Sequence, residues 1–341
     1  MIPSLFKIFF VFVLVMLTTL LITNLKGTAK DSSTEFPTPE QPKSGLGLPI
    51  DLLAALTAAH GDYESLITKD DLLDDLLAVD IVLIGEAHYD RQDMQTAFEL
   101  IRLLAQRRKI ALAVERFPIS FQPDLEALNN FEDEKLRSKR MIAFMQEDEY
   151  QTVWGINDPS QAGFSDPNQP QYPLNSPSAE VFESMMLWAA CERVPVVGMD
   201  LPLSERASGF GEDIPYRNEL WMNQIINFLE NNQSNDYLVI AIGGINHFSN
   251  APGSVQDKLH RNYSTYHFRS IGQRDVNYPS KKSKQVQDLA LAFQVDDIIL
   301  DNPQFAVVRN DGSAMFPTPP DYWIAAHIVG GWDNSANCSL N

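Results

Sequence analysis

Four short runs of apolar residues stand out in the middle of the chain, and none of them alternates apolar with polar positions. They cover residues 81–84, 110–114, 194–199 and 238–242. Runs of this kind are typical of strands with both faces covered, as in parallel sheets. The segments between them carry apolar residues at helical spacing, such as Met94, Phe98 and Ile101. This order predicts an α/β fold: a three-layer domain with a mainly parallel central sheet flanked by helices.

One interval, residues 118–177, breaks the alternation of strand and helix. It begins with apolar residues at helical spacing, among them Leu125 and Leu128, and ends in a loop rich in Pro, Asn, Gln and Ser. We expect a helical insertion over one edge of the sheet, where long insertions often form binding lids. Two later apolar stretches, residues 298–300 and 305–308, predict extra strands that close the sheet.

The amino end differs sharply from the rest of the chain. Residues 8–22 are almost wholly apolar, and no small-x-small cleavage site follows them. We therefore interpret residues 1–25 as an uncleaved signal anchor, with cleavage as the alternative, and residues 26–49 as a flexible linker. The short amino-terminal head favours export, which predicts a membrane-anchored protein on the extracytoplasmic (periplasmic) face. The α/β domain is expected over residues 50–330, with a disordered tail over residues 331–341.

Composition and cysteine content exclude several functions. The formal net charge of -19 comes from 26 Lys+Arg against 45 Asp+Glu, and a surface this acidic repels nucleic-acid phosphates. There are two cysteines and no CxxC or CxxCH motif, which excludes thiolate zinc sites and covalently attached c-type haem. Cys191 lies in an apolar run that predicts a buried thiol, and a disulfide with Cys338 is the alternative.

Polar groups follow each of the four apolar runs at once. They are Glu86 and His88 after the first run, Glu115 and Arg116 after the second, Asp200 after the third, and Gly243-Gly244 with His247 after the fourth. In open parallel sheets, ligands bind beyond the carboxyl ends of the strands, so these groups are expected to converge there. The sequence thus predicts a ligand or catalytic site at this edge of the sheet.

The residue types at that edge allow two kinds of chemistry. A histidine beside a carboxylate can act as a general base, which makes His88, Glu115 and His247 the candidate catalytic residues. His88 and His247 are also candidate ligands of a divalent metal ion, although their spacing matches no HExxH or EF-hand motif. The candidate ligand-binding residues are Glu86, Arg116, Asp200 and Arg217.

These segments, taken in order, resemble the ChaN-like proteins of the haem-binding-uptake and TIKI superfamily, which also includes erythromycin-esterase-like hydrolases. The resemblance covers roughly residues 78–270. It rests on residues 82–88, Glu115-Arg116-Phe117 with Gln122 and Leu125, Trp154, the segment PVVGMDLP at 195–202, Arg217-Asn218 with Met222, and residues 243–247 with Gly253. It implies a mixed α/β sheet with its site at the strand ends.

The superfamily implies different functions in its different branches. ChaN-type members are iron-associated lipoproteins that bind haem, with Tyr and His implicated. TIKI-type members are metal-dependent proteases that use a GxxH element, here Gly85 and His88, and esterase-type members activate water with the equivalents of His88 and Glu115. The chain departs from these patterns because it lacks a lipobox cysteine, and because it has Arg217-Asn218 where the family often shows Arg-Asp.

Three functions stay open at this point. The first is binding of haem, iron or a related ligand at the strand-end Glu/His site, with haem or a divalent metal ion as cofactor. The second is a hydrolase of esterase or TIKI-protease type in which His88 activates water, and the third is a tethered interaction domain without chemistry. The expected partners are the membrane, through the amino-terminal helix, and a small-molecule or haem ligand. Nucleic acid is not expected, and a homodimer is compatible with the sequence.

Overall fold

The computed structural model describes residues 63–86, 91–147, 177–202, 205, 214–248, 252–273, 297–303 and 320–327. All of them belong to one compact unit that spans Pro42–Asn341. The anchor, linker and tail predicted over residues 1–25, 26–49 and 331–341 lie outside the described residues. Within the described part, no helix is both long enough and apolar enough to cross a membrane.

Eight strands of the described residues form one sheet, in the spatial order β1-β7-β8-β6-β2-β5-β3-β4. Their bounds are β1 Tyr63–Ile67, β2 Ile81–Glu86, β3 Ile110–Pro118, β4 Val196–Asp200, β5 Leu238–Gly244, β6 Phe268–Gln273, β7 Asp297–Pro303 and β8 Tyr322–His327. All neighbouring pairs from β8 to β4 are parallel, whereas β7 and β1 are added antiparallel at one edge. The parallel strands β2, β5, β3 and β4 therefore present their carboxyl ends at the same edge of the sheet.

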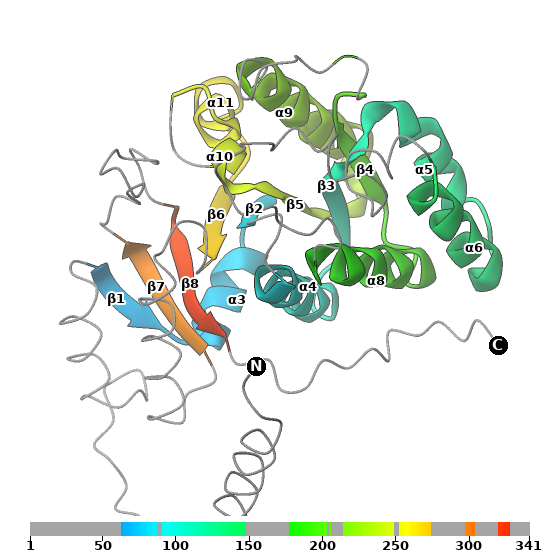
Figure 1. Cartoon of the computed structure of the whole chain (residues 1–341). Helices are drawn as coiled ribbons and strands as arrows, with labels where there is room; N and C mark the ends of the chain where they lie inside the picture. Colours follow the sequence, from blue (N-terminus) through cyan, green and yellow to red (C-terminus); the bar gives the residue numbers. More distant parts are fainter. Residues whose placement is uncertain are drawn as a thin grey trace, which may run out of the picture. The chain divides into compact units, whose positions relative to one another are not determined.

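Helices cover both faces of the sheet, as Figure 1 shows. Their bounds are α3 Lys69–Leu77, α4 Arg91–Ala105, α5 Gln122–Leu128, α6 Glu134–Met145, α8 Pro177–Cys191, α9 Ile214–Asn231, α10 Ile245–Phe248 and α11 Val255–Asn262. Short 3-10 turns lie at Ile119–Phe121 and Gln233–Asn235. The first five helices pack on one face of the sheet, and α9, α10 and α11 pack on the other.

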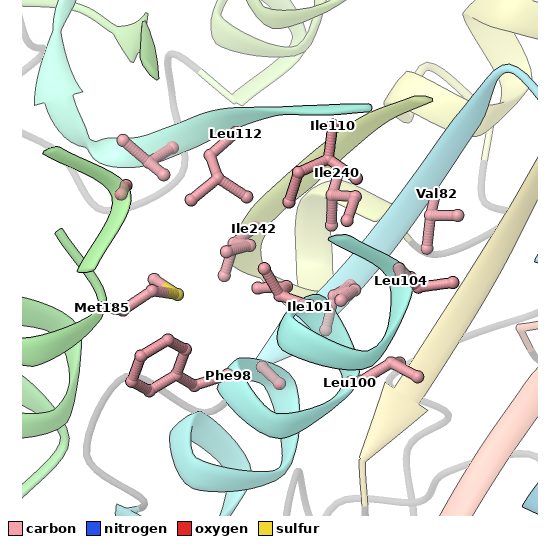
Figure 2. Packing of buried hydrophobic residues seen from close by; sticks show 14 of the residues in the cluster. Val82, Phe98, Leu100, Ile101, Leu104, Ile110, Leu112, Met185, Ile240 and Ile242 are labelled. Atoms are coloured by element: carbon pink, nitrogen blue, oxygen red, sulfur yellow. The ribbon is translucent and has the colours of Figure 1, made fainter. Parts of the chain in front are cut away.

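The strands are buried on both faces because their side chains alternate between two hydrophobic cores. On the face covered by α4, the side chains of Phe98 and Ile101 pack with Ile240 and Ile242 of β5, and Met185 reaches the same core from α8 (Figure 2). Burial of each such side chain stabilises the fold by about 1.5–3 kcal/mol. An uninterrupted apolar run is therefore what these strands require.

The predicted fold class is confirmed. The four apolar runs correspond to β2, β3, β4 and β5, and the later run at 298–300 lies in β7. Helices α5 and α6 lie in the expected insertion, whereas residues 305–308 are outside the described residues. Strands β1, β6 and β8 were not predicted. In β1 and β6 polar residues interrupt the apolar pattern, as the sequences YESLI and FRSIGQ show.

Arg137 of the insertion donates hydrogen bonds to the end of the helix that follows the insertion. Arg137 of α6 is buried, and its guanidinium donates to the carbonyl oxygens of Ala190 and Cys191 at the end of α8, at 2.6 and 2.9 Å. It also donates to the carbonyl oxygens of Phe131 and Glu132, at 2.7 and 2.8 Å. Cys191 itself is disulfide-bonded, so the free thiol predicted there is wrong.

At the opposite end of the sheet from the predicted site, Asp75 of α3 joins two strands. Its carboxylate accepts from Arg269 of β6 at 2.6 and 3.2 Å and from the hydroxyl of Tyr322 of β8 at 2.7 Å. Partial burial opposes ionisation of Asp75, but the hydrogen bonds from Arg269 and Tyr322 and the charge of Arg269 outweigh it, so its pKa is lowered. Burial raises the pKa of Tyr322, and the neighbouring carboxylate raises it further.

Substitution of Asp75 by asparagine is expected to remove an acid-sensitive part of the stability. A lowered folded-state pKa contributes stability that is fully present above the unfolded value of about 4 and is lost as the pH falls through the folded value. Because the group is partly exposed, we expect a loss of only about 1 kcal/mol at neutral pH. Urea unfolding at neutral and acidic pH measures this. The control is Asp74→Asn, because Asp74 is exposed. If both variants lost the same free energy of unfolding between neutral and acidic pH, the acid-sensitive contribution would not belong to Asp75.

Candidate functional site

The strand ends carry two polar clusters, one on each face of the sheet, rather than a single one. Consecutive residues of a strand point to opposite faces, so Glu115 and Arg116 of β3 cannot share a cluster. Glu115 faces α9 and α10, where it contacts Arg217 and His247. Arg116 faces α8, where it contacts Glu86 of β2. The pleat of the sheet thus separates the predicted site residues into two groups.

On the α9 face, Arg217 is held between two carboxylates. Its Nε and Nη2 donate to the two oxygens of Asp200, both at 2.7 Å, and Nη2 also donates to Oε1 of Glu115 at 2.8 Å. The Asp200 carboxylate further accepts from the amide N–H of Leu201 at 2.8 Å and from the indole N–H of Trp221 at 3.4 Å. The exposed fractions of the side chains are 11% for Arg217, 3% for Glu115 and 0% for Asp200. Arg217 is therefore a largely buried part of the site and not a surface ion pair.

His247 of α10 lies beside the same carboxylate. Its Nε2 is 3.8 Å from Oε1 of Glu115, and its Nδ1 is 2.6 Å from Oδ1 of Asn218. The ring stacks on the indole of Trp221, with centroids 4.0 Å apart and planes 29° apart. Stacking and hydrogen bonding together fix the plane of the imidazole and the direction of both nitrogens.

The two glycines at the carboxyl end of β5 bring the backbone close to this cluster. The amide N–H of Gly244 donates to Oε2 of Glu115 at 2.6 Å, so both oxygens of that carboxylate accept hydrogen bonds. A Cβ at Gly243 would lie 2.7 Å from the Trp221 ring and 3.0 Å from Oε2 of Glu115. Any larger residue at 243 would displace the stacked ring or the carboxylate, which gives a physical reason for glycine there.

On the α8 face, Glu86 and Arg116 form a buried ion pair across the intervening strand β5. The Nη2 of Arg116 is 3.3 Å from Oε1 of Glu86, and it also donates to the hydroxyl of Ser178 at 3.0 Å. The guanidinium lies over the ring of Phe182, 5.0 Å from its centroid. Gly244 stands opposite Glu86 in the register of β2 with β5, so β5 has no side chain at that level.

Several residues of these clusters were not predicted as site residues. Asn218 and Trp221 come from α9, and Ser178, Phe182 and Glu183 come from α8. Burial raises the pKa of the Glu183 carboxyl, and the nearby charge of Arg116 opposes that shift. A signal for Trp221 was present in the sequence, because it follows Arg217 by four residues and so shares a helix face with it.

The second predicted histidine, His88, lies outside the described residues, as do residues 87–90 as a whole. The structure therefore places His247, and not His88, relative to Glu115. In the part of the chain that is described, no three His, Cys, Asp or Glu side chains gather as a group that could hold a metal ion.

Comparison with known protein families gave a match over the segment that contains β2 and β3. Residues 72–161 match the family described as haem-binding uptake, Tiki superfamily, ChaN. This segment is ChaN-like. The predicted resemblance to that superfamily is thereby confirmed. The ChaN-like segment contributes Glu86, Glu115 and Arg116 to the two clusters, whereas Asp200, Arg217 and His247 come from the chain after it.

Three solved structures are similar to this chain at low identity. One shows cofacial haem binding to ChaN of Campylobacter jejuni: it is 12% identical, with 62% of this chain and 88% of that chain covered and a TM-score of 0.41. The type III effector HopBA1 is 16% identical, with 62% and 84% covered and a TM-score of 0.37. A protein from Bacillus cereus is 9% identical, with 80% and 96% covered and a TM-score of 0.36. We draw nothing further from similarity at this level, and comparison with curated proteins gave no match.

Proposed function

We propose that this protein binds haem or iron at the strand ends, on the face of the sheet covered by α9 and α10. The observation that carries the proposal is the buried pair of Glu115 and His247, 3.8 Å apart, in a chain whose β2–β3 segment is ChaN-like. A carboxylate clamped by Arg217 and an imidazole fixed by stacking form a preorganised polar site. Buried charges gathered at the carboxyl edge of a parallel sheet are characteristic of binding sites.

The donor chemistry of this cluster fits an iron ligand. An imidazole nitrogen is the usual protein ligand of haem iron, and Nε2 of His247 is the ring nitrogen on the Glu115 side. Glu115 and Arg217 would tune the charge around that position, since the guanidinium balances one carboxylate of the cluster. When bound, the iron would supply Lewis-acid or redox chemistry; His247 would bind it, and Glu115 and Arg217 would set the charge around it.

We also propose that the domain is tethered to the membrane through residues 1–25 and lies on the extracytoplasmic side. The apolar run at residues 8–22 and the linker composition of residues 26–49 support this arrangement. Fractionation of cells that express the full chain tests it. Release of the protein by a salt wash without detergent would contradict the anchor.

Titration of the full chain with haem, in mild detergent, tests the ligand. We expect a shift of the Soret band, and we expect His247→Ala to weaken binding more than about tenfold, which corresponds to about 1.4 kcal/mol. The matched control is His260→Ala, because His260 lies on α11 and packs against Phe268, away from the cluster. A Soret shift that is unchanged in His247→Ala would exclude this site, and the absence of any shift would exclude haem as the ligand.

The alternative function is a hydrolase in which His88 activates water and Glu115 and His247 support it. One observation favours it: a buried carboxylate and an imidazole lie side by side at the strand ends, the arrangement that general acid–base catalysis uses. In that case ester or peptide hydrolysis is abolished by both His88→Ala and Glu115→Gln, with no dependence on added haem. Activity that survives both substitutions would exclude the mechanism, and loss of both binding and turnover would leave an interaction domain.

A further inference from the structure

Which nitrogen of His247 carries the proton decides what the ring can do. A neutral imidazole donates from one nitrogen and offers a lone pair on the other. Here Nδ1 faces Oδ1 of Asn218 at 2.6 Å, whereas Nε2 faces Oε1 of Glu115 at the longer distance of 3.8 Å. The orientation of the Asn218 amide therefore determines the tautomer, because an amide oxygen accepts and an amide nitrogen donates.

The orientation of Asn218 is fixed by a second contact on its other side. Its Nδ2 donates to the backbone carbonyl of Gly253 at 2.8 Å, and a carbonyl oxygen can only accept. Gly253 is held in turn, since its N–H donates to the Asp257 carboxylate at 2.7 Å and its φ of 82° suits glycine. Because the amide nitrogen donates to the carbonyl oxygen of Gly253, the amide oxygen must be the atom that faces His247. Asn218 is 2% exposed, so water does not compete for either contact.

We propose that Asn218 is a positioning residue that holds the neutral ring of His247 in the Nδ1–H form, with the lone pair on Nε2. The tautomer follows from the hydrogen bonds alone, whereas its role in ligand binding rests on the proposed function. Histidines that bind metal ions use the same arrangement, in which the second ring N–H donates to an oxygen that fixes the ring. Here that oxygen belongs to a neutral amide, which selects the tautomer without adding charge to the site.

Nitrogen-15 NMR of the full chain, with ¹⁵N-labelled histidine at about pH 8 where free imidazole is neutral, tests the tautomer. The signals of His247 are those missing from His247→Gln. We expect a protonated Nδ1 and a pyridine-like Nε2 in the wild type. A protonated Nε2 in the wild type would overturn the proposal, even if haem binding were fully confirmed, so this result is independent of the proposed function.

Substitutions at 218 separate positioning from packing. Asn218→Asp keeps an acceptor for Nδ1–H and is expected to keep the tautomer, whereas Asn218→Leu removes the acceptor and is expected to give a mixture of tautomers. Haem affinity should fall about 10- to 100-fold in Asn218→Leu, the range found for outer-sphere partners of metal ligands. Asn232→Leu is the control, because Asn232 also donates to a backbone carbonyl but lies just beyond the far end of α9. An unchanged tautomer in Asn218→Leu would contradict the inference.

Discussion

Replacement of Arg217 by methionine is expected to lower the free energy of unfolding by about 3–5 kcal/mol and to abolish ligand binding. The guanidinium contacts Glu115 at 2.8 Å and Asp200 at 2.7 Å, and the carboxylates have almost no exposure to solvent. Without it, two buried negative charges that share one nitrogen would repel each other with little screening. Urea unfolding followed by circular dichroism measures the loss.

A double variant separates charge from packing in this network. If uncompensated charge causes the loss, Arg217→Met combined with Asp200→Asn should be less destabilised than the sum of the two single variants. Lys258→Met is the matched control, because its pair with Glu219 joins α11 to α9 at 3.2 Å with side chains 19% and 59% exposed. An exposed pair of this kind contributes at most about 1 kcal/mol. Equal losses in Arg217→Met and Lys258→Met would show that the Arg217 cluster is not the buried network described above.

Replacement of Arg137 by alanine is expected to destabilise the protein by about 4 kcal/mol. Each buried carbonyl left without a donor costs about 1–3 kcal/mol. Arg137 donates to four carbonyl oxygens, and one of them, that of Glu132, also accepts from Arg193 at 3.0 Å. Arg137→Lys should recover only part of the loss, because an ammonium cannot reproduce the planar fork of a guanidinium. The free energy of unfolding in urea is again the measurement.

A neighbouring arginine on the same helix provides the control for that experiment. Arg140 is exposed on α6, and Arg140→Ala is expected to change stability by less than about 0.5 kcal/mol. If Arg137→Ala behaves like Arg140→Ala, the insertion is not fastened to α8 through this side chain. If both lose several kcal/mol, the loss reflects the net charge of α6 and not the hydrogen bonds of Arg137.

The part of the fold that sequence predicts best is the part in which burial imposes a pattern. Strands β2, β3, β4 and β5 are covered on both faces, so each must be an unbroken apolar run. β6 carries Arg269, whose partner Asp75 is distant in sequence and close only in the folded chain. Arg269 interrupts the apolar run of β6. Its presence there is explained by the contact with Asp75, which the local sequence does not show.

The sequence by itself determined that polar groups follow four strands of a parallel sheet and that they meet at one edge. It also placed Glu115, Asp200 and His247 among the site candidates, because residue type and position after an apolar run are local properties, whereas Arg217 entered through the family resemblance. Only the tertiary structure decided which of those groups contact each other. The pleat sends Glu115 to one face and Arg116 to the other, and helix packing sets which partners each one meets. The orientation of a single amide, Asn218, depends on a backbone carbonyl thirty-five residues away, and no local pattern can specify it.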